Sequence, residues 1–276
     1  MWSKPLPGVD ITRDAYTRVR LWVRVRLCQA QTRKALTHRP EWRSVHTTRL
    51  VLWDIDHTLL STGSVGSEIF AAAFEHATGQ SMQQMADAWG RTEPAIFTET
   101  AELHGIDNPP ALFDAFAEAQ ARGYRERADD MCQRGHVLSG VVECLQRLSA
   151  KPEVIQGALT GNTQESARTK LGIFRLDTYL DLAASAYGTD DPDRAKLVDI
   201  ARHRAADRHQ TTIGQGQTVL VGDTPRDIDA GHAGGAVVIA VASGRYDVKA
   251  LREAGADAFF ADLADTDAVT AAILGR

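Results

Sequence analysis

The sequence predicts an α/β fold with a parallel sheet that is interrupted by one helical insertion. From residue 137 to the C-terminus, short apolar segments alternate with helical segments, a pattern typical of right-handed βαβ units. Residues 50–53 form an apolar run that predicts a buried strand much earlier in the chain. No β-rich segment lies between residues 66 and 135. The insertion therefore separates the first strand from the rest of the sheet.

Apolar spacing and turn residues give the expected elements in order. Inside the insertion, Ile69, Ala73, Phe74 and Ala77 recur at helical spacing, and Thr78-Gly79 ends that helix. Three more helices are expected in the insertion, at residues 82–89, 93–104 and 111–129. Later strands are expected at residues 154–159, 180–186, 217–221, 237–241 and 258–260. The accompanying helices are expected around residues 141–148 and at 164–171, 194–208, 228–233, 248–254 and 264–274, with a loop at 209–216.

The composition is that of an ordinary soluble globular protein. Hydrophobic residues make up 43% of the 276 residues and charged residues 24%, which is enough for a sizeable core. No apolar run reaches the roughly 18 residues that a membrane span needs. Cys28, Cys132 and Cys144 form neither a CxxC pair nor a zinc-ligand spacing. A reduced, cytoplasmic location is therefore expected.

The net charge of -5 is unevenly distributed along the chain. Residues 1–49 contain 11 Lys/Arg and 3 Asp/Glu, whereas residues 50–276 contain 20 and 33. The acidic body argues against nucleic acid as its partner. Residues 1–45 are expected to be a disordered basic extension. The alternatives are a transit peptide, or an arm that contacts acidic lipid or nucleic acid.

Two carboxylates follow the first predicted strand at a spacing of two. Side chains at i and i+2 of a strand point to the same side, so Asp54 and Asp56 would repel each other. Mg²⁺ prefers oxygen ligands and would offset that repulsion. The alternative is a strand-to-turn junction with two solvated aspartates.

Two later strands also end in polar residues. Thr160, Gly161 and Asn162 stand between an apolar strand and a helix, whose free N–H groups suit a phosphate. Asp223 and Asp227 follow the strand at 217–221 and would complete an oxygen cage beside Asp54. The alternatives are a plain helix N-cap at the first site and acids that complement a helix dipole at the second.

The joint pattern is more specific than its parts. Three strand ends carry Asp-x-Asp, Thr-Gly-Asn and Gly-Asp-x-x-x-Asp in this order, with the helical insertion after the first. Over about residues 49–262 the chain resembles the haloacid dehalogenase-like (HAD) hydrolase superfamily, in its phosphatase-type branch with an α-helical cap, and is similar to phosphoglycolate phosphatase-like proteins. This resemblance implies a doubly wound, Rossmann-like core at residues 46–63 and 137–276, with a helical cap at 64–136.

The resemblance also implies catalytic roles. Asp54 matches the nucleophile that becomes an aspartyl-phosphate, and Asp56 matches the general acid/base. The family further expects a cation before the helix that follows the third strand, and Arg194 and Lys196 both qualify. Arg194 is favoured because it opens the helix directly after the loop. Because true dehalogenases lack the second Asp, Asp56 favours phosphate esters over haloacids.

Phosphate and metal ligands follow from the same motifs. The matching phosphate-binding residues are Thr58, Thr160, Gly161 and Asn162. The implied Mg²⁺ ligands are Asp54, Asp56, Asp223 and Asp227, with the backbone carbonyl of Ile55. In the insertion, Arg91 is either a contact for a second anionic group of the substrate or a solvated helix-cap residue. His57 stands where the branch has Gly, which predicts an altered turn into the cap or, less favoured, a substrate contact.

The expected function is a Mg²⁺-dependent phosphatase of small phosphate monoesters, of the phosphoglycolate or sugar-phosphate type. Its partner would be a small phosphorylated metabolite. Two alternatives stay open: a phosphomutase of the same superfamily, and a non-catalytic binding protein with a retired active site. Keeping several acids that repel one another argues against the second alternative.

Overall fold

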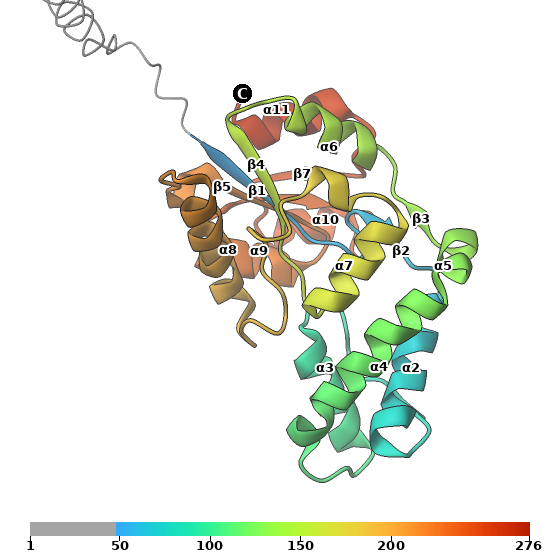
Figure 1. The fold of residues 1–276 in the computed structure, drawn as a ribbon. Helices are drawn as coiled ribbons and strands as arrows, with labels where there is room; N and C mark the ends of the chain where they lie inside the picture. The colour runs from blue at the N-terminus through green and yellow to red at the C-terminus, as the bar shows by residue number, and fades with distance from the viewer. Residues whose placement is uncertain (1–47) are drawn as a thin grey trace, which may run out of the picture. The chain divides into compact units, whose positions relative to one another are not determined.

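Five parallel strands form the central sheet, in the order β4-β1-β5-β6-β7 (Figure 1). Their bounds are β1 Arg49–Trp53, β4 Val154–Ala158, β5 Thr218–Gly222, β6 Val237–Val241 and β7 Ala258–Phe260. The structure, a computed structural model, describes residues 48–276, which belong to one compact unit. The basic extension predicted at residues 1–45 lies outside these residues.

Strand β1 lies between β4 and β5 and is buried on both faces. Leu50, Val51, Leu52 and Trp53 are all fully buried, as expected for a parallel strand between two layers of helices. Alternate residues enter different clusters, because successive side chains point to opposite faces of a sheet. The buried Trp53 indole N–H donates to Gln156 Oε1 of β4 at 3.1 Å, so that its polar atom is paired.

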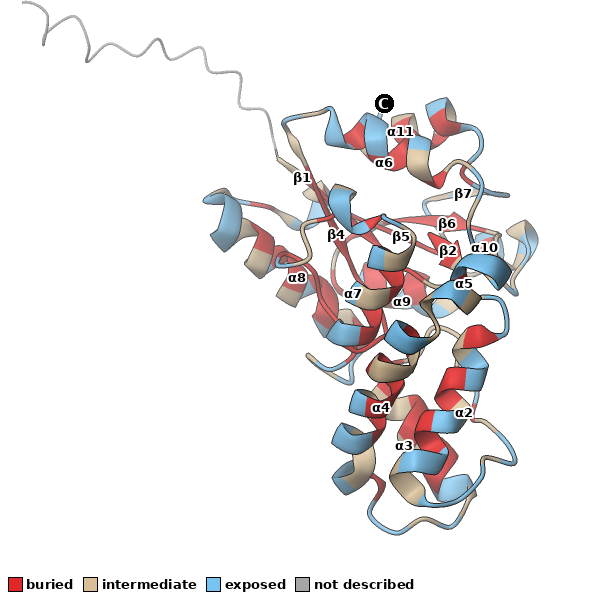
Figure 2. Cartoon of the chain, turned by 45° about the vertical axis from the view of Figure 1, so that its right-hand side comes forward, coloured by how far each residue is buried: buried red, intermediate tan, exposed pale blue. Residues whose placement is uncertain are grey.

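Helices cover both faces of the sheet. Val51 and Trp53 share a cluster with α6, α7 and α11, whereas Leu50 and Leu52 share one with α8. Helices α9 and α10 pack on β6 through Ile228 and Leu251. Figure 2 shows buried residues along the sides of these helices that face the sheet. The helix bounds are α6 Val141–Ser149, α7 Gln164–Ile173, α8 Arg194–His209, α9 Pro225–Ala233, α10 Val248–Glu253 and α11 Thr266–Leu274.

This arrangement confirms the predicted α/β class and the doubly wound parallel sheet. Carboxyl ends of neighbouring parallel strands meet along one edge of such a sheet, which is where ligands bind in open α/β folds. The order places β1 between β4 and β5, so the three predicted motifs lie side by side along that edge.

The insertion is helical and has its own apolar cluster. It leaves the core through a short antiparallel pair, β2 and β3, and its helices α2, α3 and α4 form the lower lobe in Figure 1. Phe70, Phe74, Phe97 and Phe116 form the centre of that cluster. The bounds are β2 Leu60–Ser61, α2 Val65–Thr78, α3 Glu93–Leu103, α4 Phe113–Glu126, α5 Ala128–Arg134 and β3 His136–Val137. We call residues 64–136 the cap; this division remains our proposal.

Two predicted elements are wrong. Residues 82–89 form no helix, because backbone N–H groups of this segment bond to side chains of the neighbouring segment instead. Gln83 N donates to His104 Nε2 at 2.8 Å, and Ala86 N donates to Thr100 Oγ1 at 3.1 Å. Residues 180–186 form no strand, since their pairing with the sheet is limited to one bridge between Leu159 and Ala186.

Other predicted elements of the described residues are present, with small shifts at their ends. The expected helix at residues 111–129 is divided into a 3-10 turn, Pro109–Leu112, and helices α4 and α5. Two further 3-10 turns, Asp177–Tyr179 and Gln215–Gln217, were not predicted. None of the helices between residues 48 and 276 combines the length and apolarity that crossing a membrane requires.

Replacing Phe97 by Ala is expected to destabilise the chain by about 3–5 kcal/mol, because it empties the centre of the cap cluster. The Phe97 ring is fully buried and lies 4.5 Å from Phe116 between ring centroids. Urea unfolding would measure the change. The matched control is Phe259→Ala, at a ring that is 38% exposed, for which we expect a loss of less than about 1 kcal/mol. Equal losses would contradict the packing described here.

Candidate active site

Three strand ends deliver the polar residues of the site. Asp54 follows β1, Thr160 follows β4 and Asp223 follows β5, all at the carboxyl edge of the sheet. The backbone ties these ends together, since Asp54 N donates to Val221 O at 2.9 Å and Leu159 N donates to Trp53 O at 2.8 Å. The sheet therefore fixes the backbone from which the site side chains project.

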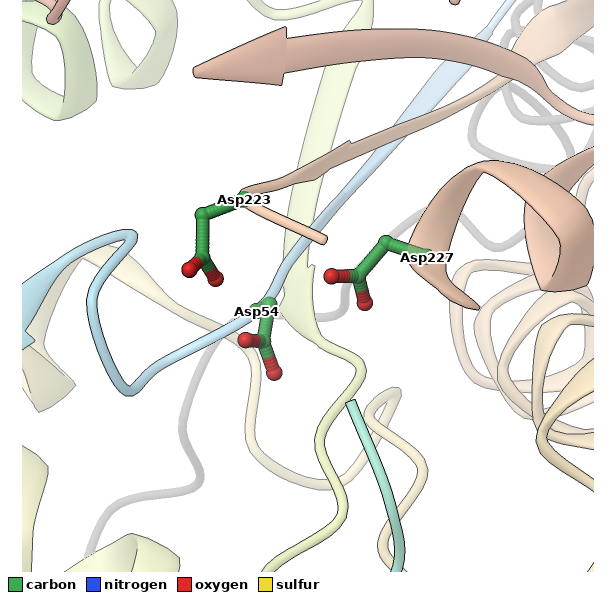
Figure 3. A group of neighbouring side chains, drawn as sticks. All are labelled: Asp54, Asp223 and Asp227. Carbon is green, nitrogen blue, oxygen red and sulfur yellow. The ribbon is translucent and has the colours of Figure 1, made fainter. Parts of the chain in front are cut away.

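Asp54, Asp223 and Asp227 form a cluster of buried carboxylates. One oxygen of each lies within 4.8 Å of the others, and Figure 3 shows the three groups converging on one space. Asp223 Oδ2 is buried and has no hydrogen-bond partner among the described residues. Three buried carboxylates at this spacing need a cation, and an unpaired carboxylate oxygen suits a hard metal. The donor set fits Mg²⁺.

Local sequence brings Asp227 into the cluster. Thr224 caps helix α9 by accepting from Asp227 N at 3.2 Å, and Asp227 Oδ2 accepts from Thr224 N at 3.0 Å. This reciprocal capping box fixes the carboxylate at the helix start. A Cβ at Gly222 would lie only 2.5 Å from Asp227 Cγ, so the close approach requires glycine at that position.

Arg194 supplies a permanent cation to this cluster. Its Nη2 donates to Asp54 Oδ1 at 3.0 Å and also to Asp227 Oδ1, and the residue is buried. Lys196 lies elsewhere: its Nζ is 3.3 Å from Asp191 Oδ2, and its side chain is 62% exposed. Residues i and i+2 of a helix do not share a face, so α8 can direct only one of the two inward. The structure brings Arg194, and not Lys196, to the carboxylates.

The protein environment raises the pKa of two of the carboxyl groups. Burial raises the pKa of Asp54 to about 7, although the Arg194 guanidinium acts in the opposite direction. Burial, together with the charge of Asp227, raises the pKa of Asp223 to about 9. A bound metal would favour the charged forms. In its absence, both groups hold a proton more readily than in water.

Asp56 belongs to a second cluster. Lys170 Nζ of α7 lies 3.0 and 2.9 Å from its two carboxylate oxygens, and Asn162 Nδ2 donates to Oδ2 at 2.7 Å. Burial would raise the pKa of Asp56, but Lys170 and the hydrogen bonds outweigh burial and lower it. The structure does not bring this side chain into the carboxylate cluster, because Lys170 and Asn162 already satisfy its charge.

Lys170 was missed by the sequence analysis. The signal was present, because Lys170 follows Ser166 and Ala167 at spacings of four and three, on the buried face of α7. A lysine on a buried helix face needs a partner. The residues near Lys170 in the sequence do not indicate this partner, because Asp56 lies 114 residues earlier in the chain.

The remaining predicted phosphate ligands have varied positions. Thr160 lines the cavity, and its Oγ1 accepts from Asn162 Nδ2 at 2.6 Å. Thr58 is fully buried, and its hydroxyl donates to Asp223 Oδ1 at 3.3 Å. The Gly161 carbonyl accepts from Glu93 N of the cap at 2.7 Å, and a Cβ on Gly161 would lie 2.0 Å from Arg91 O. Core and cap therefore pack closely at Gly161.

Glu93 joins the cap to the start of α7. Its Oε2 accepts from Thr163 N at 2.6 Å, where a helix N-terminus offers a free donor. Burial raises the pKa of Glu93 to about 7, against the opposing charge of Lys170. The sequence analysis did not identify this residue, since its partner comes from another lobe of the fold.

A cavity of about 290 Å³ lies between the cap and these groups. Core residues Asp54, Asp56 and Arg194 line it on one side. Apolar and aromatic cap residues line the other side: Phe70, Met85, Trp89, Ile96 and Tyr124. Small-molecule sites combine apolar walls with a few convergent polar groups in this way.

Comparison with known proteins identifies the family. The model of the haloacid dehalogenase-like hydrolases matches residues 51–241, more than half of the chain. The chain belongs to this family. The HAD resemblance drawn from the motifs is therefore confirmed, and with it the prediction of a hydrolase. No curated protein sequence matches the chain.

Solved structures share the HAD fold at low sequence identity. A predicted phosphoglycolate phosphatase from Haemophilus somnus 129pt has a TM-score of 0.59 and 18% identity, over 81% of this chain and 98% of that chain. A hydrolase from Pseudomonas syringae has a TM-score of 0.58 and 20% identity, over 80% and 96%. A candidate beta-phosphoglucomutase from Thermotoga maritima has a TM-score of 0.51 and 20% identity, over 80% and 98%.

His57 occupies the position where the HAD phosphatase branch was expected to have Gly. Its φ is +62°, in the left-handed region that favours glycine. Two contacts with other segments stabilise this conformation. The His57 carbonyl accepts from Ser243 Oγ at 2.6 Å, and the His57 ring lies 4.7 Å from the Trp89 ring. His57 thus adopts a backbone conformation that glycine adopts more readily, and its imidazole contacts the cap at the cavity wall; the altered turn into the cap stays a prediction.

Arg91 lines the same cavity, but its guanidinium is held within the cap. It pairs with Glu99 and donates to the Asp87 carbonyl at 3.1 Å. The structure thus does not direct this cation towards the three carboxylates. Its proposed contact with a second anionic group would require the guanidinium to leave Glu99.

The metal-free HAD chain is expected to become less stable as pH rises from about 5 to about 9. Asp54 and Asp223 have raised pKa values in the folded chain, so the folded chain binds more protons than the unfolded chain in this pH range. Raising the pH removes these protons and therefore lowers the stability of the folded state. Mg²⁺ binds the deprotonated groups, and its stabilisation should therefore grow with pH.

Thermal unfolding at about pH 6 and pH 9, with EDTA or with Mg²⁺, measures both effects. The Mg²⁺-induced rise in Tm should be larger at the higher pH and largely absent in Asp223→Asn. A rise of equal size at both pH values would contradict the assignment of these carboxylates to the metal.

Proposed function

We propose that this chain is a Mg²⁺-dependent phosphatase that hydrolyses a small phosphate monoester through an aspartyl-phosphate on Asp54. The observation that carries the proposal is the buried cluster of Asp54, Asp223 and Asp227 beside the cavity, with Arg194 bound to two of its members. Phosphoryl transfer depends mainly on positioning and on neutralising charge, and this arrangement supplies both.

Asp54 is the proposed nucleophile. Arg194 holds its Oδ1, which leaves the carboxylate facing a cavity that can receive the phosphoryl group. One carboxylate oxygen would attack phosphorus as the bond to the leaving oxygen breaks. The proposed Mg²⁺ ligands are Asp54, Asp223 and Asp227, and the bound metal would offset charge on the nucleophile and on the phosphoryl oxygens.

Asp56 is the proposed acid/base. Its side chain is 35% exposed and lines the cavity two residues after the nucleophile. Its protonated form would give a proton to the leaving oxygen, and the resulting carboxylate would then accept one from the water that attacks the aspartyl-phosphate, which restores the protonated form. That second step releases phosphate and returns Asp54 to its carboxylate form.

Thr160, with Asn162 beside it, is proposed to bind the phosphoryl oxygens. Thr160 lines the cavity, just after the end of β4 and close to the N-terminus of α7. Uncharged donors at this position can hydrogen-bond to the phosphoryl oxygens, and they add no negative charge that would repel the phosphoryl group. Gly161 would contribute by allowing the close approach of the cap.

The cavity favours a small substrate. A volume of about 290 Å³ suits a phosphate ester with a few carbon atoms, such as a phosphoglycolate-type or sugar-phosphate-type compound. One structural neighbour carries a phosphoglycolate phosphatase description, which supports the same class. Arg91 would bind a second anionic group if it left Glu99 when substrate enters.

A phosphomutase is the second candidate, and the neighbour described as a candidate beta-phosphoglucomutase favours it. A mutase passes the phosphoryl group of the phospho-enzyme to a second sugar phosphate, whereas a phosphatase passes it to water. Incubation with glucose 1-phosphate and a trace of the bisphosphate separates the two. Glucose 6-phosphate would indicate a mutase, and free phosphate would indicate a phosphatase.

Replacing Asp54 by Asn is expected to reduce hydrolysis of 4-nitrophenyl phosphate by at least about 1,000-fold, because the amide is a poor nucleophile towards phosphorus. The measurement is phosphate release with Mg²⁺ and with EDTA. Wild type should need the metal. The matched control is Asp207→Asn, at an exposed residue of α8, which should change the rate by less than about two-fold.

Two results would count against this proposal. Metal-independent hydrolysis would remove the role given to the carboxylate cluster. Full activity in Asp54→Asn would remove the nucleophile. A folded wild type that binds phosphate with Mg²⁺ but turns over no phosphate ester would instead indicate a retired site.

A further inference from the structure

A buried lysine stands behind the proposed acid/base. Lys170 belongs to α7, its side chain is only 5% exposed, and it contacts both oxygens of Asp56. We propose that Lys170 is a positioning residue that holds the Asp56 carboxylate in the orientation needed for leaving-group chemistry. The inference rests on the proposed function, since it concerns a residue that acts through Asp56.

The contacts of Lys170 leave it no donor for a substrate. A lysine ammonium has three N–H groups. They are matched by Asp56 Oδ1 at 3.0 Å, Asp56 Oδ2 at 2.9 Å and Asn162 Oδ1 at 2.5 Å. Lys170 lines the cavity with its donors already engaged. Any effect on the reaction must therefore pass through Asp56 or Asn162.

The three residues form a closed ring of contacts. Asn162 Nδ2 donates to Asp56 Oδ2 at 2.7 Å, while Asn162 Oδ1 accepts from Lys170. Each member thus bonds to both others. Hydrogen bonds from Lys170 and Asn162 prevent the Asp56 carboxylate from rotating freely. The Asp56 side chain is nevertheless 35% exposed. The ring fixes the direction of the carboxylate and leaves its cavity side open.

The cap supplies further support for the ammonium. Lys170 Nζ lies 5.0 Å from the centroid of the Tyr124 ring, on α4, in a cation–π arrangement. Helices α4 and α7 lie side by side where the lower lobe meets the core (Figure 1). The Lys170 ammonium therefore has contacts on two sides: Asp56 and Asn162 in the core, and Tyr124 in the cap.

A purely structural role does not account for this arrangement. Burying a lysine costs several kcal/mol before its partners are counted, and an apolar residue would fill the same space more cheaply. The other buried residues of α7 are Ser166, Ala167 and Leu171, none of which needs a charged partner. Preorganisation of a reacting group is a gain that an apolar residue could not supply.

The test compares substrates with good and poor leaving groups. Protonation of the leaving oxygen matters most when that oxygen is a strong base, so glycerol phosphate should depend on Asp56 far more than 4-nitrophenyl phosphate. The quantity to compare is kcat/KM, because it covers formation of the phospho-enzyme and not its later hydrolysis. The variants are Lys170→Met, Asp56→Asn and the double variant. The matched control is Lys249→Met, at a side chain that is 81% exposed.

We expect Lys170→Met to reduce kcat/KM for glycerol phosphate by about 100-fold, mostly in kcat, and for 4-nitrophenyl phosphate by less than about 10-fold. In the Asp56→Asn background the same substitution should cause less than about a two-fold further loss. The double variant removes both charges of the pair together, so it tests the inference even if Lys170→Met alone fails to fold.

A further loss of more than about 10-fold in the double variant would overturn the inference, because Lys170 would then act independently of Asp56. Equal losses with both substrates in folded Lys170→Met would also overturn it. These results differ from failure of the proposed function, in which wild type itself would release no phosphate from either substrate. That outcome would overturn both proposals.

Discussion

The structure depends on balancing charges that are buried at the carboxyl edge of the sheet. Four aspartates, Asp54, Asp56, Asp223 and Asp227, lie within a few residues of two strand ends. Isolated in a protein interior, such groups would cost more free energy than the fold can supply. Arg194 and Lys170 divide the compensation, one cation for each side of the site. The remaining charge lies in the carboxylate cluster, where a divalent metal would neutralise it.

Glycines and helix caps convert this electrostatic requirement into geometry. Gly222 lets Asp227 approach β5, and the capping box with Thr224 holds it there. Gly161 lets the backbone of Arg91 approach, and Glu93 then caps α7. The first contacts join β5 to the helix that directly follows it, whereas the second join the cap to a core segment about 70 residues later. The position of the cap over the site is thus set by close backbone packing as much as by its apolar contacts.

The sequence predicts those parts of the molecule in which the local residue pattern agrees with the fold. The buried strand with Asp54 and Asp56 at its end combines apolar periodicity with a spacing that has a clear chemical meaning, and Asp223 repeats that pattern. The helix expected at residues 82–89 does not form, because side chains of the following segment, such as Thr100, accept hydrogen bonds from its backbone N–H groups. Lys170 could not be assigned from sequence, since its meaning depends on Asp56 across the fold.

The ring of Asp56, Asn162 and Lys170 has an evolutionary consequence. Each member satisfies the other two, so changing one alone leaves a buried polar group without its partner. The three residues are therefore expected to be kept or replaced together during evolution. They nevertheless come from the end of β1, the loop after β4 and the middle of α7. A descendant that gives up the lysine must, in the same lineage, find another partner for the carboxylate, or abandon the carboxylate and the chemistry that it performs.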